Sequence, residues 1–446
     1  MMARRGIVPS SGSPAAPVRL DRGALSEAAG AIGAVEAARP RVREQVVPYR
    51  TALDFLRRAV RTPSVTGTEL AFARVVADEL EAVGADEVHL EEVEPGRPIV
   101  WSVKRGSGGG RSLLLSGHLD TVRTDGWSER WAGTEREDPF AAVIVEGAVW
   151  GRGAADLKGG MAAALGALRE LKGTPLRGDV VTAWVCDEES GEPGTGRSIG
   201  MRAVSERIVA GTIPRADFAI YTEPTSLAVY TAQIGFLIAD VEVEGRTAYF
   251  GQPEEGIDAL RAGHAVMTEL FALADELAKR PAHPLVGSPR LLVTEARAGG
   301  YIAVPGSCHL SMIRSVVPGE SLDEAAAEIE AAVARSGAGA SIRYPAGRDH
   351  ELGGLPAETD AGHPGVKGLL EALGERGRIG GAPFWAEMSF LNLLGIPCVY
   401  WAPGDIANCH TPEEHVRVEE FLDAVTTLSQ FIAGHCGAGT EQGGEQ

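Results

Sequence analysis

Cysteine is scarce in this sequence. Its 446 residues include five cysteines, an odd number, and no two of them have the CxxC spacing. A disulfide framework uses cysteines in pairs, and zinc sites made of cysteine alone use closely spaced pairs. The sequence therefore argues against both kinds of site, and we expect a protein of the reducing cytoplasm.

Long hydrophobic runs are also missing. The sequence contains no run of about 18 apolar residues, the length that a membrane-spanning helix needs. Arg4 and Arg5 are followed by serine, glycine and proline, and not by the apolar stretch of a secretory signal peptide. We expect neither a membrane-spanning helix nor a signal peptide.

Positive charge is in deficit. Lysine and arginine number 42 against 61 aspartates and glutamates, which gives a net charge of −19. Such a charge repels the phosphates of nucleic acids and the headgroups of anionic lipids. We therefore expect no nucleic acid and no membrane surface as a partner. A site rich in carboxylates fits this composition, although most surface acids only keep a protein soluble.

Short apolar runs alternate with segments of helical periodicity along the chain. This alternation is typical of an α/β sheet with buried central strands. The length exceeds what a single core usually supports, so we expect two domains. The predicted helices are residues 49–60, 68–83 and 159–171, and the predicted strands are residues 99–103, 112–116, 142–145 and 180–186.

The pattern changes near residue 234 and returns near residue 346. Between them the order is strand, helix, strand, strand, helix, strand, which is typical of a small inserted α+β unit of ferredoxin-like topology. The predicted divisions are a tail and leading segment (1–45), two parts of a main domain (46–233 and 346–436), the inserted domain (234–345) and a second tail (437–446).

Residues that can bind a metal follow two of the early segments. His118 and Asp120 come after the strand at 112–116, where the histidine could bind a metal and the aspartate could orient its ring. A histidine and an aspartate in a surface loop are the simpler alternative. Asp156 lies in the glycine-rich stretch 150–160, where the backbone can crowd a central carboxylate. That stretch lacks the GxxxxGK[ST] and GxGxxG patterns, which argues against a phosphate-binding loop.

More acids and a second histidine follow later segments. Glu188 and Glu189 end an apolar strand, where adjacent buried acids need a compensating cation. Glu223 follows another apolar run, and His410 lies in the loop before the last helix. Each motif alone also fits a solvated loop. Together, two histidines and several carboxylates at strand ends suit Zn²⁺, or Co²⁺ or Mn²⁺.

The order of these residues and their local motifs resemble a known family. GRGAADLKGG (151–160) and DEESG (187–191) are the most specific of the motifs. They are similar to those of the zinc aminoacylase/carboxypeptidase metallopeptidase family, which includes acetylornithine deacetylase, succinyl-diaminopimelate desuccinylase and glutamate carboxypeptidase. The resemblance implies a mixed-sheet catalytic domain that holds two divalent ions, most often zinc.

The resemblance also implies which residues bind these ions. The ligands implied for one ion are His118, Asp156 and Glu223. Those implied for the other are Asp156, Glu189 and His410, so that Asp156 would bridge the pair. The inserted unit would be the lid of the enzyme and the dimerisation surface of a homodimer.

The implied chemistry is the hydrolysis of an amide. Two cations acidify a bridging water and polarise an amide carbonyl. Glu188 would be the general base, which takes the proton of the water and delivers it to the leaving amine. Asp120 would orient His118.

The sequence departs from the family at a residue of the lid. Tyr249 stands where the family usually carries a histidine that reaches the partner's active site and stabilises the tetrahedral oxyanion. A tyrosine hydroxyl can donate one hydrogen bond but brings no positive charge. Tyr249 is therefore either a substitute donor or the mark of a lost or altered turnover.

Other departures concern the substrate. Arg314 could bind a substrate carboxylate through two hydrogen bonds, or it could form a salt bridge within the lid. Glu387 could replace an aspartate of the family. Trp385 and Phe384 could wall a more apolar pocket, although packing in the core is the commoner role of such aromatics.

These observations predict a di-metal amidohydrolase, or deacylase. It would act on a linear carbon–nitrogen bond of an N-acyl amino acid or a peptide-like small molecule, and not on ordinary protein peptide bonds. The altered substrate residues favour a bulkier or aromatic acyl compound over acetylornithine. The alternative, which rests on Tyr249, is a non-hydrolytic protein on this scaffold, or one that performs deamination or acyl transfer.

Overall fold

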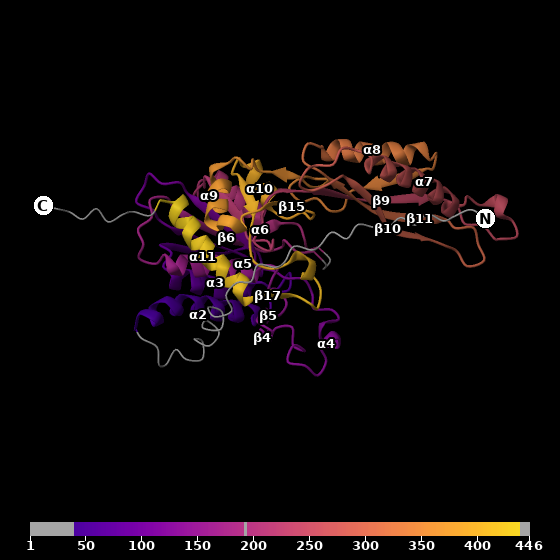
Figure 1. Cartoon of the computed structure of the whole chain (residues 1–446). Coiled ribbons are helices and arrows are strands. Elements are labelled where there is room, and N and C mark those ends of the chain that lie inside the picture. The colour runs from indigo at the N-terminus through magenta and orange to yellow at the C-terminus, as the bar shows by residue number, and fades with distance from the viewer. Residues whose placement is uncertain (1–39, 191–193, 438–446) are drawn as a thin grey trace, which may run out of the picture. The chain divides into compact units, whose positions relative to one another are not determined.

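The computed structural model describes residues 40–190 and 194–437, and its largest element is a mixed nine-stranded sheet (Figure 1). The pairs β3–β6, β3–β7 and β7–β16 are parallel, whereas β1, β2 and β14 run antiparallel to their neighbours. In spatial order the strands are β1 (Glu87–Glu94), β2 (Arg97–Lys104), β6 (Val180–Val185), β3 (Leu113–His118), β7 (Phe218–Tyr221), β16 (Cys398–Tyr400), β8 (Val229–Gln233) and β14 (Ala357–Glu358), and β15 (Ile379–Ala382) pairs with β8.

The central strands are covered on both faces. Every residue of β3, β6 and β7 is buried, which explains why these segments read as continuous apolar runs and not as alternating ones. The predicted α/β class with a mixed sheet is confirmed.

One predicted strand belongs to a different sheet. The run at 142–145 forms β4 (Val143–Val145), which pairs with β5 (Ala148–Trp150) and not with the nine-stranded sheet. With β17 (His415–Arg417) they make a separate three-stranded sheet. A short apolar run signals a strand but does not identify its partner, so the sequence could not separate the two sheets.

Helices cover the nine-stranded sheet. α5 contacts α3 and α11, α11 also contacts α9, and α6 packs against β1, β2 and β6. The described helices include none with the length and hydrophobicity that crossing a bilayer requires. The helices that lie outside residues 235–354 are α2 (Pro40–Val60), α3 (Leu70–Val83), α4 (Trp127–Arg130), α5 (Lys158–Glu170), α6 (Ile199–Val209), α9 (Pro364–Leu373), α10 (Met388–Leu393), α11 (Val418–His435), η2 (Gly374–Arg376) and η3 (Ile406–Asn408).

The first described helix begins earlier than predicted. Periodicity indicated a helix over 49–60, but α2 begins at Pro40, within the segment expected to lead into the main domain. Proline suits the first turn of a helix because its missing N–H would have no partner there. Most of both predicted tails, residues 1–39 and 438–446, lies outside the described residues.

The segment 235–354 forms a second sheet. Its strands have the spatial order β10-β11-β9-β12, with β13 also on β9, and α7 and α8 pack together on one face (Figure 1). This is the predicted β-α-β-β-α-β order, with the ferredoxin-like arrangement of its strands. The elements are β9 (Gly235–Glu244), η1 (Pro253–Glu255), α7 (Ala259–Leu277), β10 (Arg290–Ala298), β11 (Ser307–Val316), α8 (Leu322–Arg335), β12 (Ala340–Arg343) and β13 (Gly353–Gly354).

This second unit has its own hydrophobic core. Leu237 and Val241 of β9, Leu270 of α7, Leu310 of β11 and Ile329 of α8 are buried together in it. We call the unit the lid. Contacts group the described chain from Thr51 onward into one compact unit, so the proposed division into separate domains stays a prediction.

Candidate metal centre

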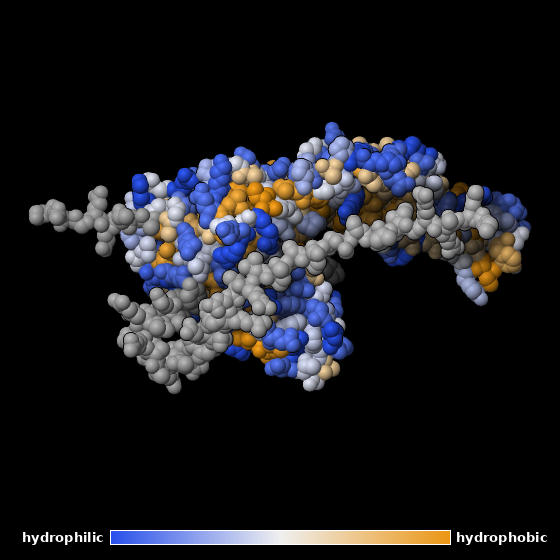
Figure 2. Space-filling view, in the orientation of Figure 1, coloured by the Kyte–Doolittle hydropathy of each residue, from blue (hydrophilic) through white to orange (hydrophobic). Residues whose placement is uncertain are grey.

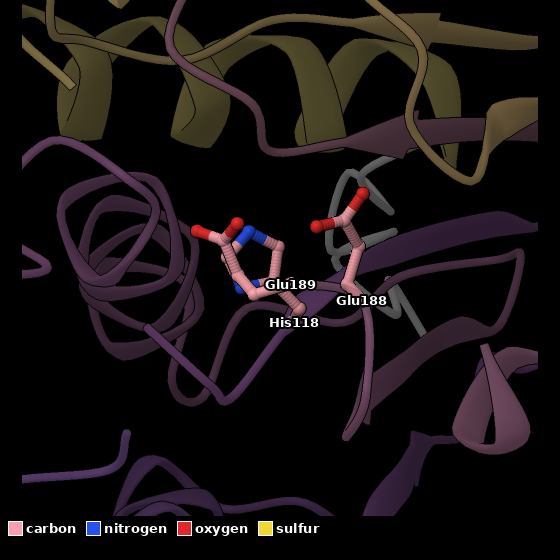
Figure 3. Close-up of side chains that lie close together, drawn as sticks. All are labelled: His118, Glu188 and Glu189. Atoms are coloured by element: carbon pink, nitrogen blue, oxygen red, sulfur yellow. The ribbon is translucent and has the colours of Figure 1, made fainter. Parts of the chain in front are cut away.

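The carboxyl ends of three strands meet at one edge of the nine-stranded sheet. His118 is the last residue of β3, and the loops after β6 and β7 supply Glu188, Glu189 and Glu223. Because these strands are parallel neighbours, their ends lie at the edge where open α/β sheets bind ligands. Figure 3 shows His118 and Glu189 together, with Glu188 beside them.

Asp156 reaches this edge from the glycine-rich loop before α5. The helix can lie close because Gly160 packs against Thr222, where a Cβ on the glycine would stand 2.4 Å from the carbonyl oxygen. Thr222 directly precedes Glu223. A glycine at position 160 therefore keeps α5 against the loop that carries this carboxylate.

The side chains form two groups that share Asp156. On one side, Nε2 of His118 lies 3.0 Å from Asp156 Oδ1 and 3.6 Å from Glu223 Oε1. On the other side, Nε2 of His410 lies 3.1 Å from both Asp156 Oδ2 and Glu189 Oε1. The two oxygens of one carboxylate thus face two separate groups of side chains, and the structure brings together the residues that were suggested as ligands from the sequence.

The chemistry of these side chains fits a pair of divalent cations. In each group the ligand atoms lie within 4.8 Å of one another. Ligands at about 2.0 Å from a tetrahedral zinc stand about 3.3 Å apart, close to the distances observed here. Asp156, Glu189 and Glu223 are buried together, an arrangement that costs free energy unless positive charge compensates it.

The titration behaviour of the cluster agrees. Burial raises the pKa of Glu223 well above its ordinary value, and the nearby charge of Asp156 adds to this. Hydrogen bonds to Asp156 and Glu189 raise the pKa of His410 to about 11. Burial disfavours the charged form of His118, yet the hydrogen bond to Asp156 and the charge of Glu223 raise its pKa well above the usual value. The cluster therefore attracts positive charge at both histidines.

Asp120 contacts the ring of His118 through its main-chain oxygen, whereas the sequence suggested a contact through its carboxylate. Nδ1 of His118 lies 2.9 Å from the main-chain oxygen of Asp120, whereas it is 3.9 Å from the carboxylate. The carboxylate instead accepts hydrogen bonds from the main-chain N–H groups of Glu188 (3.3 Å) and Glu189 (2.9 Å) and from the hydroxyl of Thr66 (3.0 Å). The backbone of Asp120 orients the ring, and its side chain fixes the turn that carries the two glutamates.

Glu188 lies beside the ligand groups but belongs to neither of the two that share Asp156. Its carboxylate comes within 4.8 Å of ligand atoms of His118 and Glu189. The residue is half-buried, and burial raises the pKa of its carboxyl well above the ordinary value. Such a carboxyl takes up a proton more readily than an ordinary glutamate does, as a general base must.

Sequence reasoning missed a residue that holds Asp156 in place. The buried carboxylate of Glu414 accepts hydrogen bonds from the main-chain N–H groups of Ala155 and Asp156, both at 3.1 Å. Its other oxygen pairs with the buried guanidinium of Arg152. Glu414 follows His410 by four residues, so one loop supplies a ligand and fixes the backbone of the shared carboxylate.

Replacing Glu414 with alanine is expected to weaken metal binding about 10- to 100-fold. The change leaves two main-chain donors unpaired and removes the carboxylate that faces the buried guanidinium of Arg152, each loss costing about 1–3 kcal/mol. Calorimetric titration with zinc measures the effect. Glu413→Ala is the matched control, because that neighbouring side chain is exposed and pairs with Arg130 at the surface. Equal metal affinity in the two variants would remove Glu414 from the support of the site.

The residues predicted to contact substrate lie in two different parts of the structure, and Arg314 and Tyr249 lie in the lid. Arg314 is buried and pairs with Glu320 and Glu328, both at 3.2 Å, so the lid salt bridge is the arrangement observed. Its hydrogen-bond partners among the described residues are all in the lid. Tyr249 is 61% exposed on the loop after β9 and bridges to Ala303.

Glu387 and Trp385 lie in the main part of the structure. Glu387 is fully buried and accepts a hydrogen bond from the Tyr221 hydroxyl (2.8 Å), and burial raises its pKa to about 7. Trp385 is half-buried and packs edge-on against Phe236 of β9, with ring centroids 5.5 Å apart. It therefore packs where the lid joins the main sheet.

An open cavity adjoins the cluster. It has a volume of about 280 Å³, and its lining includes Thr66, Ser190 and His410. His410 is the most exposed of the five candidate ligands, with 54% of its side chain accessible. This opening gives small molecules a route to the edge of the cluster.

A known sequence family and a known protein both match most of this chain. The sequence model of Peptidase family M20/M25/M40 matches residues 114–434. An acetylornithine deacetylase of Proteus mirabilis (strain HI4320) is 28% identical over 403 residues, which cover 86% of this chain and 97% of that protein.

Solved structures share the fold. An M20 family metallo-carboxypeptidase from Sulfolobus solfataricus superposes with a TM-score of 0.69 at 18% identity, over 86% of this chain and 98% of that one. A dinuclear metal-binding peptidase of the M20 family from Bacillus subtilis gives a TM-score of 0.60 at 14% identity, over 88% and 99%. At such identities the likeness shows a common fold.

Proposed function

The chain belongs to peptidase family M20/M25/M40, whose members act on amide or peptide bonds, and from this premise we propose that it is a di-metal hydrolase of a linear amide. The observation that carries the proposal is the sharing of Asp156 between two sets of buried ligands. The acetylornithine deacetylase of Proteus mirabilis, which cleaves an N-acyl bond by its name, supports an N-acyl amino acid or a peptide-like small molecule as the substrate.

We propose that the two cations are zinc, with cobalt or manganese as substitutes. Mixed imidazole and carboxylate ligands suit these metals. His118, Asp156 and Glu223 would hold one ion, and Asp156, Glu189 and His410 the other. When bound, the pair supplies a water activated as a nucleophile and a Lewis acid for the amide carbonyl.

The remaining chemistry belongs to side chains of this protein. Glu188 accepts the proton of the attacking water and passes it to the nitrogen of the leaving amine. Its turn is rigid because the carboxylate of Asp120 holds the main-chain N–H groups of Glu188 and Glu189. A raised pKa brings Glu188 closer to neutral pH, where one group can take up and release the proton.

The substrate residues favour a bulkier or aromatic acyl group. Trp385 and Phe384 bring two aromatic rings to the segment before α10, and Glu387 follows them. We propose that this segment contributes to the substrate site. A panel of acetyl, benzoyl and phenylacetyl amino acids, assayed together with metal content, tests the function. A strong preference for acetylornithine would contradict the substrate class, and protein that binds no metal would contradict the proposal as a whole.

We also propose a homodimer formed through the lid. β10 is an edge strand of the second sheet, and Leu292 on it is 61% exposed. Phe271 of α7 is 55% exposed, and Figure 2 shows hydrophobic surface at the end of the lid. Unpaired strand edges and exposed apolar side chains are features of surfaces that associate. Sedimentation at micromolar concentration that showed only monomer would contradict this.

Tyr249→Phe is expected to lower kcat by about 10- to 1000-fold, because the hydroxyl would donate a hydrogen bond to the developing oxyanion in the partner's site. Steady-state kinetics on the best amide substrate measures this. Phe250→Leu serves as a control, since Phe250 is equally exposed (60%) and offers no donor. An unchanged kcat would make Tyr249 a packing residue.

Tyr249 also supports the second candidate function. Without the lid histidine, the scaffold could bind its ligand without hydrolysis or catalyse deamination or acyl transfer. Bound metal without turnover of any amide in the panel would favour this alternative, and mass spectrometry of the products would identify another reaction.

We also propose that the protein is cytoplasmic, since all five cysteines are free and buried.

A further inference from the structure

His410 is the candidate ligand that its immediate surroundings hold least. Its side chain is 54% exposed, whereas the side chains of the other four candidate ligands are at most 7% exposed. Nδ1 of His118 contacts the main-chain oxygen of Asp120, but within the described residues Nδ1 of His410 has no hydrogen-bond partner. Metal-binding histidines usually have such a contact on the nitrogen that does not face the ion. The direction of the His410 ring therefore depends on the backbone that carries it.

The backbone at His410 has an unfavourable conformation. Its φ of +61° lies in the left-handed region, which costs free energy in a residue other than glycine. Such a conformation persists where the surrounding structure holds the chain in place. The position of His410 therefore requires contacts at other residues of its loop.

The loop of His410 is a closed turn. The hydroxyl of Thr411 donates to the main-chain oxygen of Asn408 (2.7 Å) and accepts from the main-chain N–H of Glu413 (3.1 Å). Pro412 lies within this turn and has a fixed φ. A contact that holds Pro412 therefore also restrains the backbone that leads back to His410.

Trp131, which directly follows α4, makes such a contact. Its indole N–H donates to the main-chain oxygen of Pro412 at 2.6 Å. Among the described residues, hydrogen bonds from other segments to residues 409–412 come from Trp131 and from the ligand contacts of His410. Trp131 therefore holds the turn on the side away from the ligands.

The ring of Trp131 is itself fixed. The guanidinium of Arg136 lies over the rings of both Trp131 (4.5 Å) and Trp150 (4.1 Å), and the two rings meet edge to face. The main-chain oxygen of Arg136 accepts a hydrogen bond from the buried indole of Trp127 (2.8 Å), which closes the segment 127–136 into a loop. These contacts fix the ring whose N–H reaches the turn of His410.

The neighbouring contacts between the two segments have other roles. The ion pair of Arg130 and Glu413 is exposed, and exposed pairs contribute little to stability. The ring of His415 stacks on Trp150 at the point where β17 pairs with β5. Trp131 is the residue of this group whose contact lies inside the turn of the ligand.

We propose that Trp131 is a positioning residue for His410, and that its hydrogen bond to Pro412 sets the metal affinity of the ion position that includes His410. This inference rests on the proposed function. Within the described residues, the segment 127–136 donates no hydrogen bond to His118. The ion position that includes His118 should therefore not depend on Trp131.

The test compares the two ion positions in one variant, Trp131→Phe. Phenylalanine keeps a ring beside Arg136 and removes the N–H. Anomalous scattering from crystals at limiting zinc gives the occupancy of each position, and calorimetric titration gives the two affinities in solution. The affinity at the position of His410 should fall about 3- to 10-fold, the effect of one hydrogen bond, while the affinity at the other position stays unchanged.

Trp101→Phe is the matched control, because it also removes one indole N–H, which donates to Glu91 at 2.8 Å on the β1–β2 pair. This variant should keep the ratio of the two affinities even if its melting temperature falls. Trp131→Met serves if the phenylalanine variant does not fold.

A purely structural role for Trp131 would lower the melting temperature and leave the ratio of the two affinities as it is in the parent. That result, or an equal loss at both positions, would overturn the assignment. Parent protein that binds two ions with a ratio insensitive to Trp131→Phe refutes Trp131 alone, whereas parent protein that binds no zinc refutes the proposed function.

Discussion

Replacing Glu188 with glutamine is expected to lower kcat about 100- to 10,000-fold while both metal ions stay bound. Glutamine keeps the size of the side chain but cannot accept the proton of the attacking water. The turn should remain intact, because the main-chain N–H of residue 188 still meets the carboxylate of Asp120. Steady-state kinetics and metal analysis of the same preparation measure the two effects.

The neighbouring residue provides the matched comparison. Glu189 faces His410 and Asp156 at ligand distance, so Glu189→Gln is expected to lose metal as well as activity. The pair of variants separates a base from a ligand at adjacent positions. Full activity in Glu188→Gln would exclude this residue from the mechanism.

The second large effect is expected at Asp156. Its two oxygens face His118 and His410 separately, so Asp156→Asn weakens both metal positions at once. We expect the variant to contain little metal after dialysis and to be inactive. Metal that binds the folded state raises its stability, so the wild type should melt at a higher temperature with zinc, whereas the variant should hardly respond.

A ligand of only one group is the control for this prediction. Glu223 belongs to the group of His118, and Glu223→Gln should therefore reduce metal content less than Asp156→Asn does. Two metal ions retained in Asp156→Asn would contradict a bridging role. Scanning calorimetry and metal analysis of both variants decide between these outcomes.

Local patterns marked His118, Glu189 and Glu223 because each follows an apolar run, and Asp156 because it lies in a glycine-rich stretch, whereas the grouping of these residues with His410 as ligands came from the family resemblance. Parallel strands bring the ends of β3, β6 and β7 together, so the approach of His118, Glu189 and Glu223 could be expected from local patterns. The order of strands and helices in the lid was also predictable, since the spacing of apolar residues along the sequence indicates each of these elements. What local pattern cannot give is the partner of each element, as β4 shows by pairing outside the main sheet.

Residues that act through tertiary contacts were beyond the reach of the sequence. Glu414 accepts a hydrogen bond from the main-chain N–H of Asp156, which is 258 positions away in the sequence. Arg348 donates one to the main-chain oxygen of Glu188, which is 160 positions away. Neither stands in a motif that marks its role. The ambiguity at Arg314 was of a different kind, because its partners Glu320 and Glu328 lie only 6 and 14 residues away. The sequence left both roles of Arg314 open, and only the fold brings the three side chains together.

Anomalous X-ray scattering at the zinc edge, from crystals of the zinc-loaded protein, gives the most direct test of the metal pair. Two-metal hydrolases hold their ions about 3.5–4 Å apart. We expect two peaks at about that separation, one on the side of His118 and Glu223 and the other on the side of Glu189 and His410, with the carboxylate of Asp156 between them. A single peak, or two peaks that do not share Asp156, would contradict the account.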